Sequence, residues 1–180
     1  MNPHLAAALS HLDIATRDLR AAVDAVPAPQ RGQKPAPARW SVNEVIEHVA
    51  RVEESFVGTL LSNLEAARAI GLGPEVADPP MLPDQTRTRV VDRTTPRQAP
   101  EHVLPTGAVE AMAGIQTIDA THTRLKDALT ACDGLALSTV THDHRAFGTL
   151  NLYQWVELLA GHEGRHAAQV REITTQVAGI

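Results

Sequence analysis

Hydrophobic residues recur along four stretches of the chain at the spacing of one face of an α-helix. These stretches contain no proline and span residues 4–26, 41–70, 107–131 and 151–178. The second stretch shows the pattern most simply, at steps of three or four residues: Val45, Val49, Val52, Phe56 and Leu60. Polar residues occupy the positions between, so each stretch predicts an amphipathic helix that buries one side.

Prolines divide the chain between these helices, because a proline ring breaks a helix interior. Four prolines lie between Pro27 and Pro37, and seven lie between Pro74 and Pro105. The connection from Gly71 to Pro105 is too long for a tight hairpin between antiparallel helices. The sequence therefore predicts an all-α fold, a four-helix bundle with a long crossover between helices 2 and 3, in a single domain over residues 1–180. The segment 137–150, before the last helix, fits either a short strand or a loop.

Two of the predicted helices also carry signals at their starts. Ser41-Val-Asn-Glu44 has the residue types of a capping box, in which the first and last side chains bond each other's backbone N–H groups. Asn151-Leu-Tyr-Gln154 repeats this arrangement. A tryptophan stands beside each cap, and both are expected to anchor their helices in the core: Trp40 and Trp155.

The overall charge makes several classes of partner unfavourable. The formal net charge is −5 at pH 7, and no basic cluster offers a site for nucleic acid. We expect no membrane partner, because no apolar run approaches the length of a membrane span. One cysteine, Cys132, allows no internal disulfide. Together with an N-terminal stretch that His and Asp interrupt, this predicts a cytoplasmic protein. The excess of arginine over lysine suggests a bacterial source.

Three histidines lie on the apolar faces of two helices. His48 lies between Val45 and Val52 on the stripe of the second helix, and His162 and His166 continue the stripe of the fourth. Unpaired imidazoles are costly to bury, since their ring nitrogens need partners. A shared metal ion would satisfy all three rings, so we predict a divalent metal site at His48, His162 and His166.

The ligand types limit the choice of metal. Three imidazoles without a thiolate, and without a carboxylate clearly on the same face, suit Zn²⁺ or Ni²⁺ with an open coordination position. Open positions are typical of catalytic sites, where a bound water or thiol becomes more acidic. No catalytic residue is predicted.

The segment HEGRH also matches the H-E-x-x-H pattern of zinc peptidases. These enzymes take a third ligand downstream, but no histidine follows His166 and Gln169 stands where the longer motif requires glycine. Glu163 is rotated roughly 100° from His162 around the helix axis. We therefore expect Glu163 to be a surface charge paired with Arg165 or Arg171, and we do not predict a peptidase.

Three further polar residues near the predicted site each have two interpretations. Gln169 is expected either to bond a metal-bound water or substrate, or to lie on the polar rim. Glu44 is interpreted mainly as a capping residue, with orientation of His48 as the alternative. His122 is interpreted as a hydrogen-bonded core or surface histidine rather than a fourth metal ligand.

Two segments of the chain resemble a known family. WSVNEVIEHVARVEE and FGTLNLYQWVELLAGHEGRHAAQ are similar to the DinB-like (DinB/YfiT) superfamily of metal-binding four-helix bundles. The resemblance rests on the spacing from Trp155 to His162 and on the H-x-x-R-H-x-x-Q segment that begins at His162. It implies one ligand from the second helix and two from the fourth, which correspond to His48, His162 and His166.

The resemblance leaves two function classes open. It implies on the one hand a metalloenzyme, either a metal-dependent thiol S-transferase that uses bacillithiol, mycothiol or glutathione, or a hydrolase-like enzyme that activates water. A small-molecule thiol or electrophile would be its partner. On the other hand, it is compatible with a non-catalytic metal-binding or stress-related bundle protein. Apolar surface left on the helices would favour a homodimer, which no sequence feature specifies.

Overall fold

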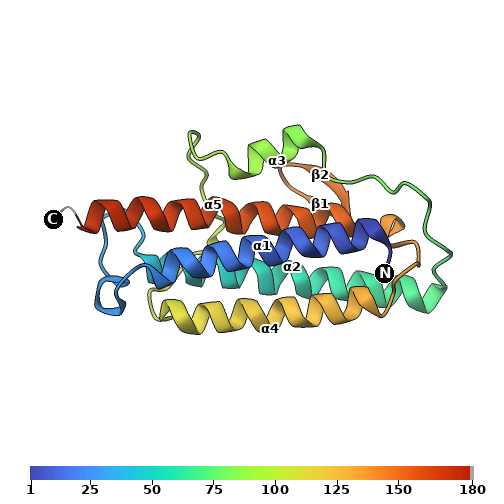
Figure 1. The fold of residues 1–180 in the computed structure, drawn as a ribbon, viewed down its shortest axis with the longest axis horizontal. Helices are drawn as coiled ribbons and strands as arrows, with labels where there is room; N and C mark the ends of the chain where they lie inside the picture. The colour runs from blue at the N-terminus through green and yellow to red at the C-terminus, as the bar shows by residue number, and fades with distance from the viewer. Residues whose placement is uncertain (179–180) are drawn as a thin grey trace.

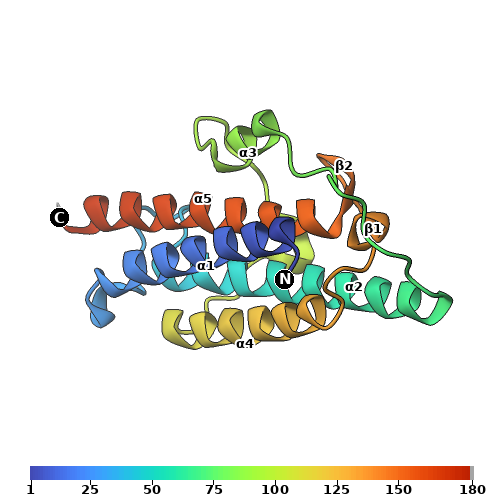
Figure 2. The ribbon, with the colours of Figure 1, turned by 45° about the vertical axis from the view of Figure 1, so that its right-hand side comes forward.

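The computed structural model describes residues 1–178 and is mostly helical. Its four long helices are α1 (Pro3–Asp24), α2 (Val42–Ile70), α4 (Ala111–Thr130) and α5 (Leu152–Ala178). They lie side by side, as two views show (Figures 1 and 2). Helix α1 packs along α5, α2 contacts both α4 and α5, and α1 also contacts α4. The predicted all-α class therefore fits the structure broadly.

Helix α4 begins later than the sequence pattern predicts, at Ala111 rather than at residue 107. The backbone before it is held in a turn, where Gly107 has a positive φ of 78°. The N–H groups of Thr106 and Gly107 donate to the buried Glu47 carboxylate, over 2.9 and 2.8 Å. These bonds fix the turn to α2 and leave Gly107 in a conformation that a helix cannot contain.

The connection between α2 and α4 contains structure that the pattern does not predict. It includes a fifth α-helix, α3 (Asp84–Val91), and a 3₁₀ turn, η2 (Glu101–Val103). Helix α3 packs on α5 (Figure 1). It is short and mostly polar, so it carries no clear apolar stripe. The close packing of α3 on α5 depends on Gly161, where an added Cβ would lie 2.8 Å from Val90 Cγ1.

A two-stranded hairpin precedes α5, so the strand alternative for this segment is the one observed. Strand β1 (Thr141–His144) pairs antiparallel with β2 (Gly148–Asn151). Trp155, which is fully buried, donates from its ring N–H to the carbonyl of His142 over 3.0 Å. The tryptophan thus ties the hairpin to the first turn of α5.

Both predicted capping boxes are present. The Ser41 hydroxyl accepts from the N–H of Glu44 over 3.3 Å, and the Glu44 carboxylate accepts from the N–H of Ser41 over 2.8 Å. The Asn151 and Gln154 pair makes the same reciprocal bonds, each over 3.0 Å. These caps fix the starts of the two helices that carry the predicted ligands.

The buried hydrophobic residues form two clusters along the length of the long helices. One cluster draws on residues 5–12, 57–64, 125–140 and 150–160, and the other on residues 19–26, 42–50, 111–118 and 167–173. Each long helix therefore contributes to both clusters, with an interval between its two contributions. Buried polar residues occupy these intervals, including Glu53, His122 and Glu163.

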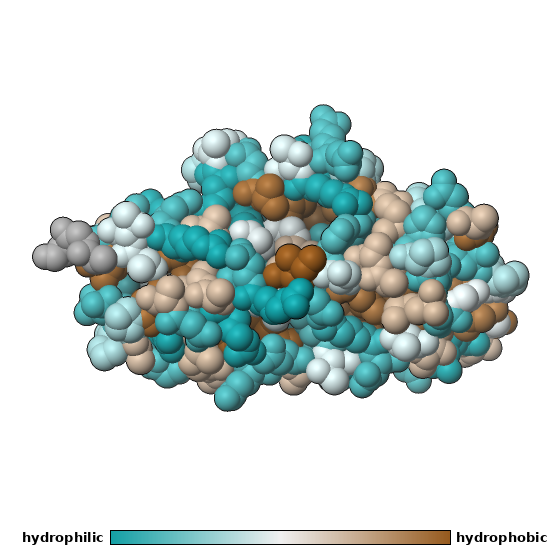
Figure 3. Space-filling model, viewed as in Figure 1, coloured by the Kyte–Doolittle hydropathy of each residue, from teal (hydrophilic) through white to brown (hydrophobic). Residues whose placement is uncertain are grey.

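On the face seen in Figure 3, hydrophilic residues separate the hydrophobic residues into small patches. Among the large hydrophobic residues that the structure describes, the exposed ones are scattered along the chain: Met1, Ile14, Ile70, Val76, Val91 and Leu104. None of the helices in residues 1–178 has both the length and the apolar character needed to cross a membrane.

Candidate metal centre

The structure brings the three predicted histidines together between α2 and α5. One ligand nitrogen from each of His48, His162 and His166 lies within 4.8 Å of the others. His162 Nε2 and His166 Nε2 are 3.1 Å apart. Two nitrogens bound at about 2.0–2.1 Å to a tetrahedral ion would lie about 3.3 Å apart. The side chains therefore fit around a single ion with little movement.

Hydrogen bonds on the outer nitrogens orient two of the three rings. His48 Nδ1 lies 2.9 Å from the Val103 carbonyl of η2, which can only accept, so Nδ1 carries the proton. His166 Nδ1 lies 2.8 Å from Gln169 Oε1, and the same argument applies. In both rings the lone pair is then on Nε2. Metal-binding histidines commonly donate their second N–H to a carbonyl or carboxylate in this way.

Burial keeps the three rings neutral. It lowers the pKa of His162 to about 3, with further contributions from His48 and nearby arginines. Burial also lowers the pKa of His48, and it lowers that of His166 well below the ordinary value. A neutral imidazole is the form that binds a metal ion. His162 Nδ1 is buried and has no hydrogen-bond partner among the described residues, so no contact fixes the proton position of this ring.

No fourth His, Cys, Asp or Glu within residues 1–178 joins this group. The protein side chains would thus supply three nitrogen ligands and leave a further coordination position open. Exposure is uneven around the cluster, because His48 and His166 are buried while His162 is only half-buried. Of the three rings, His162 is therefore the one nearest to solvent.

Arginines lie near the cluster. Arg93 donates to Gln169 Oε1 over 3.3 Å and forms an ion pair with Glu172. Arg165 donates to the Asp92 carbonyl and is buried, whereas Arg97 is exposed. Both Arg97 and Arg165 contribute to the lowered pKa of His162, so their positive field reaches the cluster.

The polar residues with two interpretations take definite positions. Gln169 bonds the imidazole of His166 directly, which neither interpretation anticipated. Glu44 serves the capping box and also pairs with Lys34. His122 does not join the three histidines, and it lies in the core beside Glu53.

The predicted position of Glu163 on the surface is wrong. This side chain is 0% exposed and accepts a hydrogen bond from the Thr16 hydroxyl over 2.9 Å. It pairs with neither Arg165 nor Arg171. Glu163 is rotated away from His162 around α5 and faces α1 and α4. Other helices cover α5 on this side too, so Glu163 is buried. The glutamate of H-E-x-x-H therefore does not face the three histidines.

Sequence reasoning also missed Glu53 and Val103. Glu53 lies four residues from both Val49 and Val57, so the spacing did indicate a buried position. The role of Val103 depends on its backbone carbonyl, and a side-chain pattern carries no signal for that.

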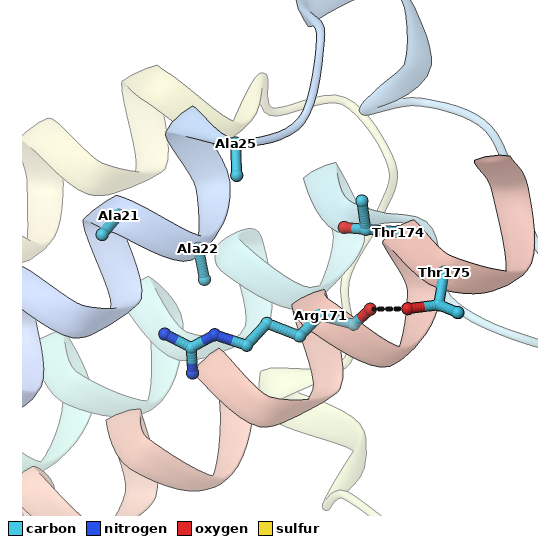
Figure 4. A pocket seen from close by; sticks show the side chains of 6 residues that line it. All are labelled: Ala21, Ala22, Ala25, Arg171, Thr174 and Thr175. Carbon is cyan, nitrogen blue, oxygen red and sulfur yellow. Dashed lines mark hydrogen bonds between the residues drawn. The ribbon is translucent and has the colours of Figure 1, made fainter.

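A separate shallow pocket of about 300 Å³ lies between α1 and the C-terminal part of α5 (Figure 4). Small side chains and Arg171 line it, and Arg171 is already paired with Asp18. It contains no metal-binding side chain, and it gives no competing site for chemistry.

Comparisons with known proteins bear on the family of this chain. The chain is 26% identical over 148 residues to the uncharacterized protein YuaE of Bacillus subtilis (strain 168), a match that covers 81% of this chain and 83% of YuaE. No solved structure matched significantly. The sequence profile of the DinB superfamily matches residues 11–170, a range that contains all three histidines. The chain belongs to the DinB superfamily.

Proposed function

We propose that this protein is a metal-dependent thiol S-transferase, with Zn²⁺ or Ni²⁺ held by His48, His162 and His166. The four long helices would form a four-helix bundle, and the segment with α3 and η2 would be its crossover. The observation that carries the proposal is the group of three neutral imidazoles that no fourth protein ligand completes within the described residues. Catalytic zinc sites have this composition, whereas structural sites are closed by four protein ligands.

A bound divalent ion would supply one chemical effect, the lowering of a thiol pKa so that thiolate forms at neutral pH. The protein side chains have distinct parts in this proposal. Val103 and Gln169 fix the proton positions of His48 and His166, so that both Nε2 atoms can bind the ion. Hydrogen bonds of this kind also increase the basicity of the ligand.

The arginines beside the cluster favour a negatively charged thiol. Arg97 is exposed, and its charge acts on His162, so it can attract an anion as it approaches. Bacillithiol and glutathione carry carboxylates and meet this requirement. The electrophile would enter from the same side, since His48 and His166 are buried.

The test is the conjugation of a haloaromatic or an epoxide with bacillithiol, mycothiol or glutathione. The metal-loaded protein is compared with the chelated protein, with His166→Ala and with the control His4→Ala, whose residue is not part of the cluster. Transfer that needs metal, is lost in His166→Ala and persists in His4→Ala is the expected result. Full metal loading without turnover of any thiol would refute the transferase and favour a non-catalytic metal-binding or stress-related bundle.

A further inference from the structure

A second group of metal-binding side chains lies in the interval between the two hydrophobic clusters. It consists of Glu53 of α2, His122 of α4 and Glu163 of α5, which are 0%, 2% and 0% exposed. One ligand atom from each lies within 4.8 Å of the others. Thr16 of α1 contacts two of them, so all four long helices contribute to this polar layer.

The hydrogen bonds of Thr16 determine where the proton of His122 lies. Its single hydroxyl proton has two acceptors, the Leu12 carbonyl and the Glu163 carboxylate, both at 2.9 Å. Toward His122 Nδ1, at 3.2 Å, the hydroxyl oxygen is therefore the acceptor and Nδ1 carries the proton. His122 Nε2 then presents a lone pair to Glu53 Oε2, only 2.5 Å away.

This contact does not have hydrogen-bond geometry. His122 Nε2 and both Glu53 oxygens have no hydrogen-bond partner among the described residues, and neither has Glu163 Oε1. A lone pair facing a carboxylate oxygen at this distance is repulsive unless a proton or a metal ion is shared between them. Four unpartnered ligand atoms in one dry layer are what a metal ion would satisfy.

The charge balance points the same way. In the described part of the chain, neither Glu53 nor Glu163 forms an ion pair with a lysine or arginine. Two buried carboxylates stay ionised only with a cation beside them, and otherwise they take up protons. One divalent ion with two carboxylates and a neutral imidazole gives a net charge of zero.

A groove leads toward this layer from the surface between α1 and α4. It has a volume of about 670 Å³, and Thr16 and His122 are among its lining residues. Asp13 and Asp119 also line it, and they pair with Lys126 and Arg20. The groove therefore reaches Thr16 and His122 at the edge of this layer, on a side away from the three-histidine cluster.

We propose that Glu53, His122 and Glu163 form a second site for a divalent transition-metal ion, separate from the three-histidine site. Its carboxylate–imidazole ligands suit Mn²⁺, Fe²⁺ or Zn²⁺. Thr16 positions His122 and occupies the second oxygen of Glu163. The site is independent of the proposed thiol chemistry.

Metal content tests this proposal without an activity assay. Metal-free protein is dialysed against buffered Zn²⁺, and separately against Mn²⁺, and the bound metal is measured by mass spectrometry. We expect two zinc ions per chain in the natural protein, one in Glu53→Gln, one in His48→Ala and none in the double variant. Glu54→Gln is the matched control, because Glu54 is the exposed neighbour on α2, and it should keep both ions.

Thermal stability gives a second readout. Added Zn²⁺ should raise the melting temperature of His48→Ala, and this rise should disappear when Glu53→Gln or His122→Gln is added. Two variants keep the test valid if one of them fails to fold. If the two carboxyl groups are instead simply protonated, Glu53→Gln binds as much metal as the natural protein and melts at the same or a higher temperature. That outcome would overturn the second site, whereas loss of metal from His48→Ala alone would not.

Discussion

His162 and Glu163 are adjacent in the chain, yet they belong to two different polar groups on two sides of α5. His162 Nε2 faces His166 Nε2 at 3.1 Å, between α5 and α2. Glu163 instead accepts from Thr16 of α1 and lies near His122 of α4. Residues adjacent on a helix are separated by roughly 100° around its axis. One turn of α5 can therefore serve two separate sites.

Removal of any one of the three histidines should release the ion that they share. We expect His48→Ala, His162→Ala and His166→Ala each to lose one metal equivalent, because two imidazoles bind an ion far more weakly than three. Elemental analysis after dialysis measures the loss, with His4→Ala as the control. If His48→Ala kept its full metal content, the three-histidine site would be excluded.

Chelation should lower the melting temperature while leaving most of the helix content. An ion present at 100 times its dissociation constant adds about 2.7 kcal/mol to stability. The two hydrophobic clusters and the capping boxes do not depend on the ion, so the helices should persist. Circular dichroism at 222 nm follows both properties. Complete unfolding at room temperature would show that the metal is structural.

The pH dependence of folding should include a contribution from His144. Burial, aided by Arg145, Arg97 and His142, lowers its pKa to about 4 from the ordinary 6.5. The ring lies against Phe56 and Trp155. Between these two pKa values the unfolded chain binds more protons, so stability falls as the pH is lowered through this window.

Replacement of His144 by glutamine should flatten this fall. The difference should be below about 1.4 kcal/mol per pH unit, the value for one whole proton, because the ring stays partly exposed. Urea titrations of chelated protein at several pH values between 4 and 7 measure it. His102→Gln, at an exposed position, is the control. Equal slopes for the natural protein and His144→Gln would contradict the shift.

Two glycines of α5 provide a matched pair that tests how closely α3 packs on α5. An alanine at Gly161 would bring its Cβ to 2.8 Å from Val90 Cγ1, so α3 must move. We expect Gly161→Ala to destabilise the protein by about 1–3 kcal/mol. At Gly164 the nearest atom is Val91 Cγ1 at 4.0 Å, so Gly164→Ala should be neutral or stabilising by up to about 1 kcal/mol. Urea denaturation distinguishes the two, and equal effects would refute the close contact.

Neutralising Arg97 should weaken the capture of an anionic thiol. Because this arginine is exposed, Arg97→Gln should raise KM by up to about fivefold, or roughly 1 kcal/mol, with kcat nearly unchanged. The increase should shrink at high salt, where surface charges are screened. Steady-state kinetics at two ionic strengths measure this. A fall in kcat at constant KM would mean that Arg97 does not act by attraction.

The amphipathic pattern was sufficient for the long helices and for the grouping of the three histidines. His48, His162 and His166 lie on the apolar faces of their helices. The periodicity of each helix alone shows which face is buried, so it predicts that these three side chains point into the core. The two capping boxes fixed the register. The short helix α3 was missed because its stability depends on contact with Gly161 of α5, a tertiary feature.

Glu163 was misplaced for a related reason. Helical geometry gives its angle relative to His162, but it does not say whether another helix covers that side. Here α1 and α4 do, and Thr16 and His122 supply polar neighbours. A glutamate buried in the protein interior is rare enough that residue type alone favours the surface. Only the arrangement of all four long helices reveals the polar layer.

The bond from His48 to Val103 has a consequence for how this site can vary. The acceptor is a main-chain carbonyl, which is present whichever amino acid occupies position 103. The orientation of His48 is therefore protected against single substitutions there, and changes in the length of the loop would disturb it instead. The orientation of His166 depends on a side chain, Gln169. A substitution of Gln169 can therefore change the orientation and basicity of His166 while His48 stays fixed.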